Sequence, residues 1–240
     1  MIMLKSGVCS VTFRQLSPEE VIQLAVKAGL DSIEWGGDIH VPAGDLETAR
    51  RVGELTRAAG LEVAGYGSYM RCLDPSEIAP VTETAKALQA PAIRIWTGST
   101  ARKNVSGDDA ESMGNVIRQL CDTVPEMTVA SEFHRNTFTE DADSALEMVK
   151  LVDRKNYRSS FQLYAHHDIP SAVEKIEPFL GNVHVYSYEH APLADTFDIW
   201  QNLMEKFKRR DRTLLLEFTK DNLPENFLAD AETLKKLLQL

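Results

Sequence analysis

The sequence has few cysteines and no long run of apolar residues. Its three cysteines, Cys9, Cys72 and Cys121, are odd in number and show no C-x-x-C spacing. We therefore expect reduced thiols rather than a disulfide framework or a zinc finger. Lys5 interrupts the apolar start of the chain before a signal-peptide core can form, and nowhere do ~18 apolar residues run together. These absences predict a cytoplasmic protein that does not cross a membrane.

Positive charge is also scarce, because 26 lysine and arginine residues face 36 acidic ones and give a net charge of −10. Such a protein repels phosphate backbones and anionic lipid, so we expect neither nucleic acid nor a membrane as partner. The sequence also lacks a P-loop, a G-x-S-x-G motif and an H-E-x-x-H motif. With 43% hydrophobic and 26% charged residues, it still has the composition of an ordinary globular protein.

What the sequence does contain is a repeat with a period of 31 residues, marked by Gly29, Gly60 and Pro91. Each copy ends a helical pattern with Gly or Pro and continues into a short apolar run with an aromatic end. Before the first copy, residues 17–20 (SPEE) form a capping box, with Ser17 as the N-cap, Glu20 three residues later and Pro18 at the first helical position. Continued along the chain, the pattern predicts strands at residues 7–13, 32–35, 62–66, 92–96, 128–132, 160–164, 182–186 and 213–218.

Strands and helices that alternate at this period indicate a parallel sheet, and eight such units are the number that closes a (β/α)8 barrel. An open doubly wound sheet is the alternative. No linker, charge block or low-complexity tract divides the chain, so residues 1–240 are expected to form a single TIM-barrel domain of the α/β class.

Four polar residues interrupt the apolar runs near the ends of successive strands in the second half of the chain: Glu132, Gln162, His184 and Glu217. The carboxyl ends of barrel strands meet at one mouth, where barrel enzymes carry their active sites. Burying such groups is costly unless something pairs with them, and carboxylate, amide oxygen and imidazole are donors for a divalent ion. The four residues therefore predict a metal site.

All six histidines, at positions 40, 134, 166, 167, 184 and 190, lie on or just beyond the end of a predicted strand. This placement is typical of a catalytic mouth. Of these, His190 and one of His166 and His167 are expected to be solvated bystanders.

With these residues in view, the chain resembles the xylose isomerase-like family of barrel proteins, the sugar isomerase/epimerase group that also contains the endonuclease IV branch. The resemblance extends over nearly the whole chain. It rests on residues 7–14 (GVCSVTFR), 30–35 (LDSIEW), 36–42 (GGDIHVP), Glu132-Phe133-His134, Val183-His184-Val185 and 215–218 (LLEF).

The resemblance implies that Glu132, His184 and Glu217 are metal ligands. Many members place an Asp on the sixth strand, whereas this chain has Gln162 and resembles a subgroup with an aromatic-Gln pair there. If Gln162 points away, the fourth ligand is instead one of His166, His167 or Asp168. We expect the metal to be Mn²⁺, with Mg²⁺, Co²⁺ or Zn²⁺ as alternatives.

The chemistry expected of this site is proton transfer beside a carbonyl through a metal-stabilised enediolate, with Glu132 and Glu217 as the acid/base pair. The predicted enzyme is a metal-dependent sugar isomerase or epimerase that acts on an unphosphorylated keto-sugar or polyol-derived ketone. The residues expected to bind the sugar are Arg14, His40, Trp96 and His134.

Three alternatives remain open at this point. A keto-polyol dehydratase would use nearly the same metal site but expel a hydroxyl group. A non-catalytic sugar-binding barrel would have no need of two facing carboxylates, and a nuclease of the endonuclease IV type conflicts with the charge of −10. A homo-oligomer is expected, because members of the family often form dimers or tetramers.

Overall fold

Eight parallel strands alternate with eight α-helices in the computed structural model, which describes residues 3–163 and 168–240. The strands are β1 (Leu4–Cys9), β2 (Ser32–Gly36), β3 (Glu62–Gly67), β4 (Ala92–Ile95), β5 (Thr128–Glu132), β6 (Tyr157–Phe161), β7 (Leu180–Val185) and β8 (Arg212–Leu216). The helices are α1 (Pro18–Ala28), α2 (Leu46–Ala58), α3 (Ile78–Leu88), α4 (Gly107–Thr123), α5 (Ala142–Val152), α6 (Ile169–Ile176), α7 (Phe197–Phe207) and α8 (Pro224–Leu238). Within those two ranges, no helix has the length and apolar character needed to span a membrane.

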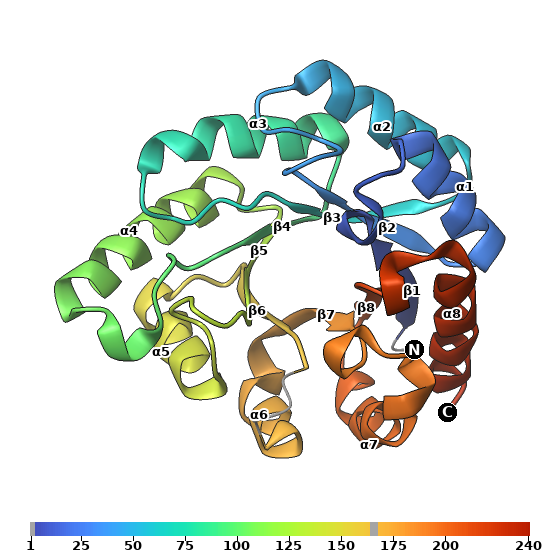
Figure 1. Cartoon of the computed structure of the whole chain (residues 1–240). Helices are drawn as coiled ribbons and strands as arrows, with labels where there is room; N and C mark the ends of the chain where they lie inside the picture. Colours follow the sequence, from blue (N-terminus) through green and yellow to red (C-terminus); the bar gives the residue numbers. More distant parts are fainter. Residues whose placement is uncertain (1–2, 164–167) are drawn as a thin grey trace.

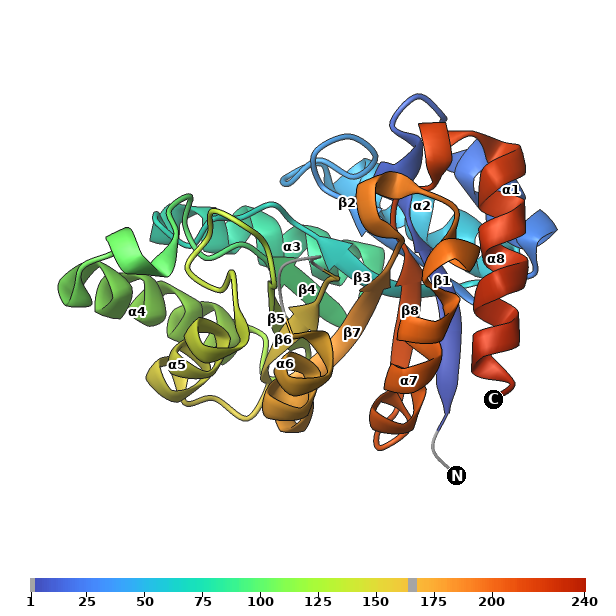
Figure 2. The ribbon, with the colours of Figure 1, turned by 60° about the horizontal axis from the view of Figure 1, so that its bottom comes forward.

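The sheet closes on itself. Each strand pairs in parallel with its neighbour in the sequence, and β1 pairs with β8 from Leu4 opposite Arg212 to Val8 opposite Leu216. The helices lie outside this barrel, and the start of β1 and the end of α8 lie on the same side of it (Figures 1 and 2). The closed ring confirms the predicted (β/α)8 barrel and excludes the open doubly wound sheet. Because all strands run the same way, their carboxyl ends open at one mouth.

Local signals in the repeat set the helix ends. The Ser17 hydroxyl accepts from the Glu20 N–H and the Glu20 carboxylate accepts from the Ser17 N–H, so the predicted capping box is confirmed. Gly29 ends α1 with a φ of 66°, in the left-handed region that favours glycine. In the third copy the period placed the end of the helix at Pro91, but the residue that caps the end of α3 is Gln89, two residues earlier, which has a φ of 58°. The repeat therefore preserves the geometry of the joint rather than the residue type.

Two of the predicted strands have bounds that differ from those in the structure. Strand β1 covers Leu4–Cys9, whereas Ser10–Phe13 forms a buried 3₁₀ turn. An apolar run does not distinguish a buried strand from a buried helical turn, and for this reason the prediction of a single strand over residues 7–13 is wrong. Strand β6 covers Tyr157–Phe161 rather than residues 160–164, and residue 164 lies outside the described residues. Arg158, Ser159 and Ser160 are polar, so this strand lacks the apolar run by which the others were found.

Candidate metal and active site

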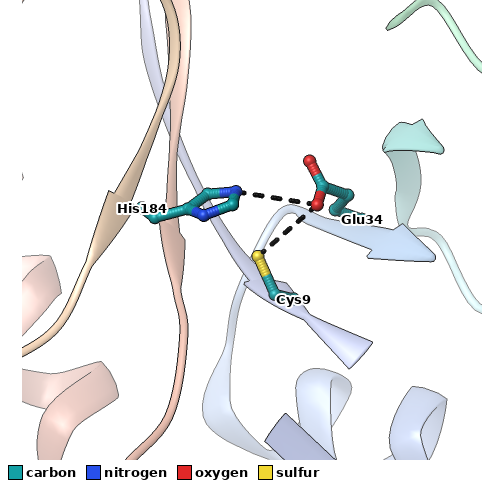
Figure 3. Close-up of side chains that lie close together, drawn as sticks. All are labelled: Cys9, Glu34 and His184. Carbon is teal, nitrogen blue, oxygen red and sulfur yellow. Dashed lines mark hydrogen bonds and ion pairs between the residues drawn. The ribbon is translucent and has the colours of Figure 1, made fainter. Parts of the chain in front are cut away.

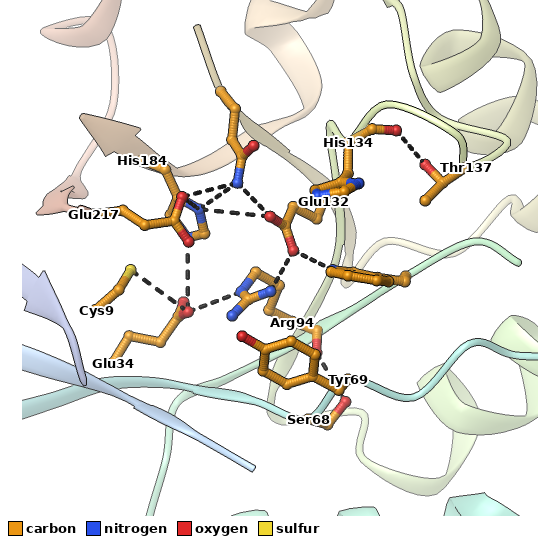
Figure 4. A network of polar contacts seen from close by, with 12 residues as sticks. Cys9, Glu34, Ser68, Tyr69, Arg94, Glu132, His134, Thr137, His184 and Glu217 are labelled. Carbon is orange, nitrogen blue, oxygen red and sulfur yellow. Dashed lines mark hydrogen bonds and ion pairs between the residues drawn. The ribbon is translucent and has the colours of Figure 1, made fainter. Parts of the chain in front are cut away.

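Polar side chains from four strands, and from the first residue after two others, converge inside the carboxyl-terminal mouth of the barrel (Figure 4, which labels all of them except Gln162). They are Glu34 (β2), Arg94 (β4), Glu132 (β5), Gln162 (directly after β6), His184 (β7) and Glu217 (directly after β8). None is more than 4% exposed. Side chains alternate between the two faces of a strand, so residues at matching positions of a closed sheet all point into its interior. Four of the six were predicted from the sequence, and Glu34 and Arg94 were not.

Glu132 receives three hydrogen bonds. The Arg94 Nη1–H and the Trp96 Nε1–H both donate to its Oε2, and the Gln162 Nε2–H donates to its Oε1. These three donors hold the Glu132 carboxylate in a fixed position inside the cluster.

Arg94 joins two carboxylates, because its Nε–H donates to Glu34 Oε1 at 2.8 Å while its Nη1–H donates to Glu132. Gly67 makes room for this guanidinium, since a Cβ at that position would clash with Arg94 Nη2. Burial raises the pKa of Glu34, but the charge of Arg94 and the contact with His184 outweigh burial and lower it to about 2. Glu34 is therefore an ionised carboxylate in the barrel interior.

His184 lies between the carboxylates and is fully buried. Its Nδ1 lies 3.1 Å from Glu217 Oε2 and 4.0 Å from Glu132 Oε1, while its Nε2 faces the other way, 3.6 Å from Glu34 Oε1. Burial lowers the pKa of His184, but Cys9 and Glu217 beside it raise it well above the usual range. Burial likewise raises the pKa of Glu217, and the nearby His184 and Arg94 reverse that effect and lower it.

Gln162 points into the cluster, as the ligand prediction requires, and its amide nitrogen faces both glutamates. The Nε2–H groups donate to Glu132 and, at 2.9 Å, to Glu217 Oε2, and Nε2 lies 3.0 Å from His184 Nδ1. An amide that serves as a metal ligand must present oxygen, which requires Gln162 to turn over. Of the alternatives, His166 and His167 lie outside the described residues, and Asp168 caps α6 by accepting from the Ser171 N–H.

Above the cluster is a cavity of about 250 Å³ that opens at the mouth. Its lining comprises Arg14, Tyr69, Trp96, Glu132, His134, Arg135, Gln162, Tyr186, His190, Glu217 and Phe218. Trp96 stacks on His134 with ring centroids 4.5 Å apart. Arg14 Nη2 donates to Asp38 Oδ2 at 2.5 Å and to the Tyr69 hydroxyl at 3.0 Å. Three of the four predicted sugar-binding residues thus line one cavity with the two catalytic candidates.

His40 does not line the cavity, contrary to the prediction that it binds the sugar, whereas His190 does. His40 is buried, its ring nitrogens 2.9 Å from Ser10 Oγ and 3.1 Å from the Leu16 carbonyl, and it is absent from the described lining of the cavity. His190, expected as a bystander, is exposed but lines the cavity and stacks on Phe218 with ring centroids 4.7 Å apart. Loop histidines are placed by how the loop returns over the mouth, which strand periodicity does not encode.

The geometry of the cluster fits a divalent ion. One donor atom each from Glu132, His184 and Glu217 lies within 4.8 Å of the others, and all three residues are buried. Three ligands about 2.1 Å from one ion would be roughly 3–4 Å apart, so a small contraction suffices. The oxygen and imidazole donors are those that Mn²⁺, Co²⁺ and Zn²⁺ accept. The described residues therefore include a buried group able to hold a metal ion.

The chain is thus a closed eight-stranded TIM barrel whose carboxyl-terminal mouth holds a buried group of carboxylates and histidine able to bind a metal ion. The profile of the family described as Xylose isomerase-like TIM barrel matches residues 22–237, which is most of the chain. The chain belongs to this family, and the resemblance inferred from its sequence is confirmed.

Proteins that resemble this chain in sequence or in structure differ in the reactions that their names give. A 3-dehydroshikimate dehydratase of Bacillus anthracis is 22% identical over 212 residues, covering 81% of this chain and 76% of the relative. Among solved structures, D-psicose 3-epimerase of Clostridium cellulolyticum H10 has a TM-score of 0.80 at 14% identity, covering 98% of this chain and 99% of its own. The 3-keto-D-glucoside 4-epimerase of E. coli has a TM-score of 0.76 at 15% identity, covering 99% of this chain and 100% of its own. At these identities the structural likeness shows a shared fold.

Proposed function

We propose that this chain is a divalent-metal-dependent enzyme that removes a proton from the carbon beside a carbonyl in a small polyhydroxylated ketone or hydroxy acid. The observation that carries the proposal is the charge of the buried cluster. Three carboxylates, Glu34, Glu132 and Glu217, share one guanidinium and one imidazole. Even with His184 protonated, one negative charge stays uncompensated, and a buried charge of that kind calls for a cation.

When bound, a divalent cation supplies positive charge that stabilises the negative charge developing on a substrate oxygen. Glu132, His184 and Glu217 would hold it, and Gln162 would join them once its amide has turned. Trp96, stacked on His134, offers a flat surface for the apolar face of a sugar. Arg14, held by Asp38 and Tyr69, offers guanidinium donors for hydroxyl or carboxylate groups at the rim.

Isomerisation or epimerisation is the first candidate reaction, with Mn²⁺ as the proposed metal. Glu132 and Glu217 both line the cavity, and both carboxylates contact the Gln162 amide. One of them would take the proton from one face of the substrate carbon and the other would return a proton to the opposite face. The epimerases among the solved structures of the same fold support this assignment.

Dehydration is the second candidate, favoured by His134. Its Nδ1 lies 2.7 Å from the Arg135 carbonyl, which can only accept, so in the neutral ring Nδ1 carries the proton and Nε2 keeps a free lone pair. Glu132 already accepts three hydrogen bonds, and His134 lines the same cavity. His134 would then take the proton and a hydroxyl would leave. The dehydratase relative supports this alternative.

The proposal extends to the setting of the enzyme. Residues 1–240 are proposed to form a single domain that works in the cytoplasm on a small sugar-like molecule, with neither nucleic acid nor membrane as partner. The net charge of −10 supports this, because it opposes binding to polyanions. Assembly into a homo-oligomer is proposed from the resemblance to the family.

The test is deuterium uptake from D₂O into a panel of keto-sugars, polyol-derived ketones and 3-dehydroshikimate, with Mn²⁺-loaded protein and NMR detection. We expect Glu132→Gln and Glu217→Gln to lose exchange by at least ~100-fold while the thermal unfolding midpoint stays near wild type. Glu147→Gln, which changes a half-buried carboxylate of α5 that pairs with Arg102 away from the cavity, is the matched control. Wild-type exchange in both site variants would refute the mechanism.

The products separate the two reactions. An epimer or aldose in the wild-type reaction assigns the first candidate, and loss of water with a new conjugated double bond assigns the second. His134→Gln should slow dehydration by at least ~100-fold if His134 is the base. A protein that binds sugars and never exchanges a proton would instead be a binding barrel.

A further inference from the structure

A second group of donor atoms, from Cys9, Glu34 and His184, lies on the side of the His184 ring that faces away from Glu217 (Figure 3). Cys9 Sγ, at the end of β1, lies 3.8 Å from Glu34 Oε1, and His184 Nε2 lies 3.6 Å from the same oxygen. Cys9 and Glu34 are 1% and 4% exposed, and His184 is fully buried. The group therefore combines a thiol, a carboxylate and an imidazole out of contact with bulk water.

His184 Nε2 is buried and makes no hydrogen bond among the described residues, because its contact with Glu34 Oε1, at 3.6 Å, is longer than a hydrogen bond. Unpartnered buried nitrogen is rare in folded proteins and needs an explanation. The other ring nitrogen, Nδ1, already faces Glu217 and Gln162. Nε2 is therefore aimed at Cys9 and Glu34 and takes no part in the upper cluster.

The spacing of the three atoms approaches that of a tetrahedral metal site. With zinc-to-ligand distances of about 2.3 Å for sulfur and 2.0–2.1 Å for nitrogen and oxygen, tetrahedral ligands lie roughly 3.3–3.5 Å apart. The two distances to Glu34 Oε1 exceed this by a few tenths of an ångström. Glu34 Oε1 also accepts from Arg94, and a carboxylate oxygen has a second lone pair for a metal.

An ion could approach Glu34 from the amino-terminal end of the barrel. A cavity of about 500 Å³ opens at the amino-terminal end of the barrel and reaches Glu34 and Arg94. The strand residues lining its walls include several small ones, namely Ala64, Ala92, Ala130, Ser160 and Gly181. Barrel interiors are normally filled by bulky branched side chains, so this hollow is a departure from the usual packing. An ion could thus reach Glu34 without passing through the upper cavity.

We propose that Cys9, Glu34 and His184 Nε2 form a second cation site that takes a thiophilic divalent ion such as Zn²⁺ and competes with the upper site for His184. Sulfur and imidazole donors select such ions over Mg²⁺ or Mn²⁺. A neutral imidazole has one nitrogen free to bind a metal, and the other carries the proton. An ion on Nε2 therefore leaves Nδ1 as N–H pointing at Glu217, and removes a ligand from the upper site.

The test is a titration of the full chain, stripped of metal by a chelator, with Co²⁺ as a spectroscopic substitute for Zn²⁺. Wild-type protein should develop the near-ultraviolet absorption of a Co²⁺–thiolate bond and the visible bands of tetrahedral Co²⁺. Cys9→Ala should lose the thiolate band completely. Cys121→Ala, which removes another buried cysteine from α4, is the matched control and should keep it. Cys9→Ser replaces the alanine variant if circular dichroism shows that the latter is unfolded.

Absence of the thiolate band in wild-type protein at saturating Co²⁺ would overturn the second site, and so would the same band in Cys9→Ala. Competition is measured by loading the protein with Mn²⁺ first and following free Mn²⁺ by electron paramagnetic resonance. Release of Mn²⁺ in step with the growing band supports a shared His184, and full retention of Mn²⁺ refutes it. No substrate is involved, so failure of the proposed catalytic function leaves this result unaffected.

Discussion

Replacing Arg94 by methionine should destabilise the protein strongly. The guanidinium is 3% exposed and donates hydrogen bonds to both Glu34 and Glu132. The substitution therefore removes the positive charge that lies between these two buried carboxylates. Methionine has a similar length and fills the space, so the effect reports charge rather than a cavity. Removing one partner of a buried ion pair leaves an uncompensated charge in the interior.

The expected cost is about 3–5 kcal/mol for a broken buried pair, and the shared second carboxylate places it at the upper end. For a chain of this size each kcal/mol lowers the thermal midpoint by about 2–4 °C, so Arg94→Met should unfold roughly 8–20 °C below wild type. The control is Arg154→Met. Arg154 makes a comparable two-point contact with Asp122, but both side chains are more than a third exposed. Its loss should cost under about 1 kcal/mol.

The cost of Arg94→Met should also depend on pH. In the wild type the pKa of Glu34 is lowered from 4.5 to about 2, so this contribution to stability is present above pH 4.5 and is lost as the pH falls towards 2. Without Arg94, burial dominates and raises the pKa of the carboxylate, which then takes up a proton already on mild acidification. The gap between wild type and variant should therefore be widest near pH 7 and narrow below about pH 4.5.

The assay is calorimetric or fluorescence-detected thermal unfolding in the presence of a chelator, between pH 4 and pH 8. Refutation would take the form of an Arg94→Met midpoint that equals that of Arg154→Met, or of a gap that widens as the pH falls. Either result would mean that Arg94 does not hold the buried carboxylates together.

His184→Ala should lower Mn²⁺ affinity by more than roughly 100-fold, about 2.7 kcal/mol, and reduce the metal content of Mn²⁺-soaked protein, measured by calorimetry and plasma mass spectrometry. Its effect on the metal-free unfolding free energy should be smaller, and an unchanged Mn²⁺ dissociation constant would contradict the ligand assignment. Ser17→Ala should cost about 1 kcal/mol in urea unfolding, because it removes the side-chain acceptor of the α1 capping box. Ser112→Ala, at an exposed position within α4, should be neutral or slightly stabilising, and equal effects at the two sites would argue against a capping role.

The buried cluster links the two ends of the barrel interior. Glu34 and Arg94 line the lower cavity, and Glu132 and Glu217 line the upper one. A thin layer of paired charges thus separates two openings in a region that most barrels fill with apolar side chains. A change in the charge of this layer should therefore affect both metal binding and the stability of the barrel.

The architecture followed from patterns that are local in the sequence. A capping box at Ser17, left-handed glycines at Gly29 and Gly60 and apolar runs at a fixed period each depend on a few neighbouring residues. Eight such units have few other ways to bury their apolar faces. The strand ends that carry Glu132 and Glu217 follow from the same period, which is why these two residues could be placed at one mouth.

Local patterns in the sequence were enough to give the number and order of the units and the strand ends that carry polar residues. The closure of the sheet, and the side chains that meet across the barrel, became known from the three-dimensional structure. Arg94 contacts Glu34, 60 residues away, and Glu132, 38 residues away, and His40 turned to Ser10 instead of the cavity. Such contacts depend on the register of strands distant in sequence and on the space left by Gly67, whereas periodicity records only which face of its own strand a residue occupies.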